Sequence, residues 1–242
     1  MNASAIPDHI QVKLDHAQAF HLRIKETCLT HIDAPSDKHL KRISVYMGEM
    51  SQAIRSALNN TMWDFCETKI KPAVSQGEYN KIRWSHDFPL ESENLRFVQS
   101  KTRALRNIAQ GYPAIYQFLE SVQPYHKDYE FLASIRVLSN DTSHTIPVQV
   151  RHDDIRQMLF PGASAPSIRG NEVVVQWSPE QPATSYTIPA YVDKLTMYIA
   201  TDRTWHIFLM STDGRTHFSP TPFSKMAPSR VSNLLTDFYA LG

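Results

Sequence analysis

The chain has few glycines and few cysteines. Only seven glycines occur in 242 residues, and none forms a GxGxxG or GxxxxGK[ST] phosphate loop. The GxSxG nucleophile motif is absent as well. The two cysteines, Cys28 and Cys66, lack CxxC spacing, which argues against a disulfide framework or a thiolate metal site. We expect both to be small buried hydrophobic residues.

Recognised metal-ligand spacings are also missing. The chain has eleven histidines, but those of its N-terminal region include no i, i+4 pair, and HExxH is absent. We therefore expect neither a metal centre nor a cofactor.

The sequence has neither an excess of positive or negative charge nor a long apolar run. The 25 Lys and Arg residues against 24 Asp and Glu give a net charge of +1, so no global attraction to DNA or anionic membranes is expected. No eighteen apolar residues run together, and residues 1–7 lack the basic and apolar regions of a signal peptide. These features predict a soluble cytoplasmic protein.

The N-terminal part of the sequence is patterned for helices. In residues 40–70, apolar side chains recur at three-and-four spacing, which predicts one long helix after a turn and N-cap at Pro35, Ser36 and Asp37. Further helices are predicted by similar patterns, with a loop over 77–89: residues 8–32, 93–110, 113–122 and 127–139.

After Pro147 the pattern becomes that of strands. A hairpin turn is expected at Asp213 and Gly214, and a closing helix at 228–241. The expected strands are 148–151, 172–177, 194–201, 205–211 and 215–219. The order predicts an α+β fold, with an antiparallel helical bundle (1–146) and an antiparallel β meander with a closing helix (147–242), packed as one compact protein.

Several short motifs resemble, in order, a family of uncharacterised bacterial proteins. In that family a long helix reads approximately GDxxHNLRSALDHLxxxL and is followed by FPI, QPY and LxNxDKHR. The matching segments here are Gly48-Glu49, Ile54-Arg55-Ser56-Ala57-Leu58, Phe88-Pro89-Leu90, Gln123-Pro124-Tyr125, and Leu138, Asn140 and His144.

The RSALDH element of that family is similar to the RxxxxH signature of HEPN helical-bundle proteins, several of which are dimeric, metal-independent endoribonucleases. The resemblance implies that Arg55 stabilises charge on a phosphate and that a histidine transfers protons. Here the sixth position is Asn60, which cannot do acid-base work near neutral pH. His144 is the candidate replacement.

Two interpretations of Arg55 stay open. It is either a solvated helix residue, paired through a neighbour with Glu49 or Glu67, or a phosphate or carboxylate anchor. The Asn60 substitution favours a non-catalytic binding or interaction protein with a degenerate site. The alternative is a toxin- or defence-type endoribonuclease with Arg55, Asn60 and His144 as catalytic residues. The resemblance implies RNA as a partner and a homodimer.

Overall fold

Helices make up most of the part of the chain whose side chains the structure describes. The structure is a computed structural model that describes residues 6–30, 36–85, 87–100, 102–144 and 220–241, and short strands between residues 150 and 218. The side chains of residue 29 and of residues 140–218 lie outside this description. The helices are α1 (Asp8–Thr30), α2 (Asp37–Phe65), the π-helix η1 (Cys66–Ile70), the 3₁₀-helix η2 (Lys71–Ala73), α3 (Gln76–Ile82), α4 (Asn94–Val98), α5 (Arg103–Gly111), α6 (Pro113–Ser121), the 3₁₀-helix η3 (Lys127–Tyr129), α7 (Phe131–His144) and α9 (Pro220–Leu241).

The chain divides into two compact units. The first, here called the helical unit, comprises residues 1–20, 48–146 and 226–242, and the second comprises residues 21–47 and 147–225. The helices α1, α2 and α9 each contribute residues to both.

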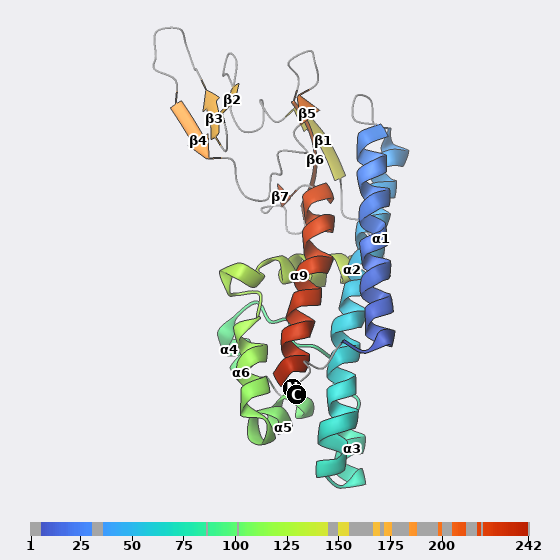
Figure 1. The fold of residues 1–242 in the computed structure, drawn as a ribbon, viewed down its shortest axis with the longest axis vertical. Coiled ribbons are helices and arrows are strands. Elements are labelled where there is room, and N and C mark those ends of the chain that lie inside the picture. Colours follow the sequence, from blue (N-terminus) through green and yellow to red (C-terminus); the bar gives the residue numbers. More distant parts are fainter. Residues whose placement is uncertain are drawn as a thin grey trace. The chain divides into compact units, whose positions relative to one another are not determined.

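One carboxylate joins three helices of the helical unit. Asp64 Oδ2, near the end of α2, lies 3.3 Å from His9 Nε2 at the start of α1 and accepts a 3.3 Å hydrogen bond from Tyr239 Oη near the end of α9. The start of α1 therefore meets the ends of α2 and α9, so α1 runs antiparallel to both (Figure 1).

The C-terminal helix supplies part of the core of the helical unit. The ring of Phe238 in α9 packs edge-on against Phe65 of α2 and Phe118 of α6, with centroid separations of 5.7 and 5.9 Å. Val231 and Leu234 on the same stripe are buried, as the sequence predicted. The helix begins at Pro220, eight residues before the predicted start, and contains Pro228 in its interior. Proline suits a first helical turn, which made Pro228 a misleading start signal.

The long helix predicted over residues 40–70 is confirmed. Its apolar stripe is buried, including Ile54, Leu58 and Met62. It begins at Asp37, because the Ser36 carbonyl already accepts hydrogen bonds from the amides of His39 and Leu40. After Phe65 the hydrogen-bond pattern changes from α-helical to that of the π-helix η1, which extends the helical segment to Ile70.

The loop predicted over residues 77–89 is wrong in its first part. Residues Gln76–Ile82 form α3, whose N-cap is Ser75. Ser75 Oγ accepts a hydrogen bond from the amide of Glu78 at 3.3 Å. Ser75 and Glu78 have the spacing of a capping box, a start signal that outweighs the helix-weakening Gly77.

The single helix predicted over residues 93–110 is also wrong, because the structure divides it into α4 and α5. Between them, Ser100 Oγ accepts a 3.4 Å hydrogen bond from the amide of Thr102, and Thr102 has extended backbone angles. A hydroxyl that bonds nearby backbone competes with the helical pattern. The neighbouring predictions are closer: α6 matches residues 113–122, and 127–139 becomes η3 followed by α7.

The expected α+β fold with a β meander is wrong. None of the residues whose side chains the structure describes lies in a strand, and the buried apolar side chains among them come from helices and their connections. The strands between α7 and α9 are short and belong to two separate sheets, in the orders β1-β6-β5, with β7 also paired to β6, and β2-β3-β4. They are β1 (Val150–Asp154), β2 (Ser167–Arg169), β3 (Glu172–Val175), β4 (Thr184–Thr187), β5 (Tyr198–Ile199), β6 (Trp205–Ser211) and β7 (His217–Phe218), and all pairs are antiparallel.

The single meander fails because β1 pairs with the distant β6, with Val150 opposite Met210, instead of with the next strand. The expected turn at Asp213 and Gly214 lies outside the described residues. Among the described helices, none is long and apolar enough to cross a membrane.

A candidate anion-binding pocket

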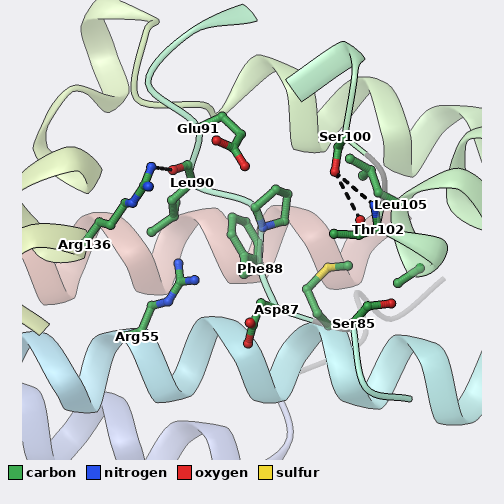
Figure 2. Close-up of a pocket in the computed structure, with 13 residues that line it drawn as sticks. Arg55, Ser85, Asp87, Phe88, Leu90, Glu91, Ser100, Thr102, Leu105 and Arg136 are labelled. Atoms are coloured by element: carbon green, nitrogen blue, oxygen red, sulfur yellow. Dashed lines mark hydrogen bonds between the residues drawn. The ribbon is translucent and has the colours of Figure 1, made fainter. Parts of the chain in front are cut away.

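A pocket of about 220 Å³ lies in the helical unit beside the C-terminal half of α2. One wall is α2, another is the segment 85–91 that follows α3, and the others come from the α4–α5 connection, α5 and α7 (Figure 2). It is lined by Arg55, Met62, Ser85, Asp87, Phe88, Pro89, Leu90, Glu91, Ser100, Thr102, Ala104, Leu105 and Arg136.

One face of α2 is turned toward segment 85–91. Arg55, Asn59 and Met62 follow one another at spacings of four and three residues, which places them on one side of a helix. Arg55 and Met62 line the pocket, and Asn59 bonds to the segment itself. The buried stripe that includes Ile54 and Leu58 lies next to this face and fixes the orientation of the helix.

Segment 85–91 has no regular structure over residues 87–91, and side chains bind its backbone instead. The side chain of Gln123 is fully buried; its Nε2 donates to the Pro89 carbonyl at 3.0 Å, and its Oε1 accepts from the Glu91 amide at 2.9 Å. The Leu90 carbonyl accepts from Arg136 Nη1 at 2.7 Å. Buried backbone groups need such partners, so these bonds hold the pocket wall in one conformation.

The guanidinium of Arg55 is the unusual group of this pocket. Its Nη1 atom is buried and has no hydrogen-bond partner. Figure 2 shows the side chain pointing from α2 toward Leu90, with Asp87 to one side. A buried donor on a charged group costs free energy when it has no acceptor.

Three other charges surround Arg55. Burial lowers the pKa of Arg55; the charge of Asp87 raises it, that of Arg136 lowers it and that of Glu91 raises it. Arginine nevertheless keeps its proton in proteins. The pocket thus combines two guanidinium groups with two carboxylates.

Hydroxyl groups and apolar side chains line the remainder of the pocket. Ser100 Oγ lies 3.3 Å from Thr102 Oγ1, and in Figure 2 both lie on the side of Phe88 away from Arg136. Leu105 lines the pocket on the same side. The two sides of the pocket therefore differ in chemistry, charged on one and weakly polar to apolar on the other.

The structure places only one of the three predicted site residues in this pocket. Arg55 lines it, whereas Asn60, one position beyond the Asn59 that bonds Asp87 and Phe88, does not. His144 is the last residue of α7, and its side chain lies outside the described part of the chain. Of the two carboxylates considered as indirect partners of Arg55, Glu67 bonds Lys71 and Tyr79.

The ordered motifs converge in space. Arg55, the Phe88-Pro89-Leu90 segment and Gln123 come from three motifs that are far apart in sequence, and they meet around the pocket wall. Leu138 of the fourth motif is buried on α7, the helix that carries Arg136. Residues of three of these motifs thus lie at one structural site.

Sequence reasoning missed four residues of this site. Arg136, Asp87, Glu91 and Gln123 were not predicted to act together. One usable signal was the i+4 spacing from Arg55, which selects Asn59 and hence the segment that it bonds. The sequence carries no comparable signal for Arg136, because it contacts the segment only through tertiary structure.

No group of three or more His, Cys, Asp or Glu residues suited to a metal ion is found in the described part of the chain. Cys28 and Cys66 are free and buried, and burial raises the pKa of each thiol to about 12. Searches of family models, of curated proteins and of solved structures find no match to this chain.

Proposed function

We propose that this protein is a non-catalytic binding protein that holds an anionic group at Arg55. The observation that carries the proposal is the buried Arg55 Nη1 without a hydrogen-bond partner in a pocket of 220 Å³. An anion in this position satisfies the donor and offsets the cost of burying the charge, and guanidinium groups suit carboxylates and phosphates.

Proton-transfer chemistry has less support than binding. Cleavage of RNA without a metal requires a group that exchanges a proton near pH 7, most often histidine. The described residues that line the pocket include no histidine, and Asn60 has no titratable group; His86, between the lining residues Ser85 and Asp87, lies outside the described residues. Catalysis through Arg55, Asn60 and His144 stays a prediction, as does membership of a HEPN-like family.

The resemblance to HEPN bundles also supports a homodimer as part of this proposal. Two-fold symmetric dimers are the commonest soluble assembly. Static light scattering at micromolar concentrations tests it, and a monomer mass across the range rejects it.

Anion binding is tested by thermal unfolding of the purified chain with acetate, inorganic phosphate or a short RNA oligonucleotide at constant ionic strength. A ligand that binds only the folded state raises the midpoint with concentration. We expect at least one anion to do so in wild type and in Asn60→Ala, and none in Arg55→Met. The proposal fails if no ligand that carries a carboxylate or a phosphate raises the midpoint, or if the rise persists in Arg55→Met.

Incubation with total RNA, read on a gel, addresses catalysis separately. We expect intact RNA. Cleavage that disappears in Arg55→Met would replace the binding proposal with the ribonuclease alternative.

A further inference from the structure

The charges around the pocket are balanced but not paired with one another. Arg55, Arg136, Asp87 and Glu91 all line it, yet no ion pair joins any two of them. Their described hydrogen bonds lead elsewhere: Arg136 donates to the Leu90 carbonyl, and Asp87 accepts from the Asn59 side chain. Two cationic and two anionic groups that line one pocket are thus not used against one another.

A simple anion satisfies only half of this arrangement. A phosphate dianion or a strand of RNA placed at Arg55 also comes near the carboxylates of Glu91, which is half-buried, and Asp87, which is exposed. Both repel it, Asp87 less strongly because solvent screens its charge. A ligand that carries both signs satisfies both pairs of groups.

The volume of the pocket limits the size of the ligand. An engineered cavity of about 150 Å³ holds one benzene, so about 220 Å³ encloses the part of a ligand that has roughly ten non-hydrogen atoms or fewer. A whole nucleotide exceeds this size. A small α-amino acid, with a carboxylate and an ammonium group on one carbon and a short side chain, fits it.

We infer that the pocket binds a small zwitterion of the α-amino acid class. This inference rests on the proposed anion-binding function and names its ligand. The carboxylate accepts hydrogen bonds from Arg55 Nη1 and from donors of Arg136 that are not bonded to Leu90. The ammonium group donates to the carboxylates of Asp87 and Glu91, and the ligand's side chain extends toward Ser100 and Leu105.

Calorimetric titration of the full chain tests this assignment. The probes are L-alanine, L-serine and L-leucine, each compared with its amide, which lacks the carboxylate, and its N-acetyl derivative, which lacks the ammonium group. We expect saturable binding of at least one amino acid and a loss of about tenfold or more in affinity for both derivatives.

Two isosteric variants locate the ammonium site. Glu91→Gln keeps the backbone bond to Gln123, and Asp87→Asn keeps an oxygen that accepts from Asn59. Each is expected to weaken amino acid binding by about tenfold while acetate binding is unchanged or tighter, because a repelling charge is removed. Asp128→Asn, outside the pocket, serves as the control.

The outcomes separate this inference from the proposed function. If phosphate, acetate or RNA binds in an Arg55-dependent way but none of the amino acids does, the zwitterion inference is overturned and the anion-binding function stands. If the affinity for an amino acid is no higher than that for its N-acetyl derivative, the ammonium site is rejected. If no probe binds in an Arg55-dependent way, both proposals are rejected.

Discussion

Asn59 and Asp87 are joined by a hydrogen bond of 2.9 Å from Nδ2 to Oδ1, and Asn59 Oδ1 also accepts from the Phe88 amide at 3.0 Å. One side-chain amide therefore ties α2 to the pocket wall with both of its ends. Because Asp87 lines the pocket, the same bond orients a carboxylate close to Arg55.

Replacing this amide is expected to loosen the wall. Asn59→Ala removes the acceptor of the Phe88 amide, and we expect a loss of about 1–2 kcal/mol in the free energy of unfolding. Asn60→Ala, at the neighbouring position, should change it by less than about 0.5 kcal/mol. Urea denaturation measures both, and equal effects would show that Asn59 has no special role.

The buried Gln123 is expected to matter more. Gln123→Met keeps a similar length but leaves the Pro89 carbonyl and the Glu91 amide without partners, which should cost about 2–4 kcal/mol. Gln110→Met, at an exposed position of α5, is the matched control. A loss below about 1 kcal/mol in Gln123→Met would mean that water or a shifted backbone replaces these bonds.

The helices with strong apolar periodicity were predictable from the sequence, because burial of one stripe determines both their existence and their orientation. The stripes of α2 and α9 are examples. The break before Thr102 and the start at Ser75 were missed because hydrogen bonds of single hydroxyl groups decide them. The β meander failed because strand pairing between distant segments is not encoded in local alternation.

The candidate site was predictable only in part. Arg55 stood out through its motif, but its partners come from segments 87–91 and α7, which the sequence does not connect. Asn60 was predicted as a site residue because the resemblance places a histidine at that position. Helix geometry favours Asn59 instead, and the structure shows its bonds to the pocket wall.

A pH dependence is expected from the second compact unit. His21 is buried, its Nδ1 lies 3.0 Å from Ser224 Oγ, and its pKa is lowered from 6.5 by burial and then by the charges of Lys25 and Lys225. The unfolded chain therefore binds a proton at this residue at higher pH than the folded chain does. The stability that neutral His21 contributes is present above its unfolded pKa of about 6.5 and is lost as the pH falls below that value.

Urea denaturation at pH values between about 7.5 and about 5 measures this effect, because this range brackets the unfolded pKa of about 6.5. The slope of unfolding free energy against pH should be shallower in His21→Gln than in wild type. His16→Gln, an exposed position on the same helix, should keep the wild-type slope. A wild-type slope in His21→Gln would assign the pH dependence to other groups.

In the absence of ligand, substitution by methionine should affect the free energy of unfolding differently at the two arginines of the pocket. Arg55→Met removes a half-buried charge whose buried Nη1 has no partner, so no acceptor is left unsatisfied, and the free energy of unfolding should stay equal or rise by up to about 1 kcal/mol. Arg136→Met removes the donor to the Leu90 carbonyl and should lower it by about 1–2 kcal/mol. Both are measured by urea denaturation in a buffer without small carboxylates or phosphate. A loss of about 1–3 kcal/mol in Arg55→Met would show that Arg55 forms stabilising bonds within the folded protein. The proposal of an anion at this position would then fail, because it depends on a guanidinium that has no partner in the folded chain.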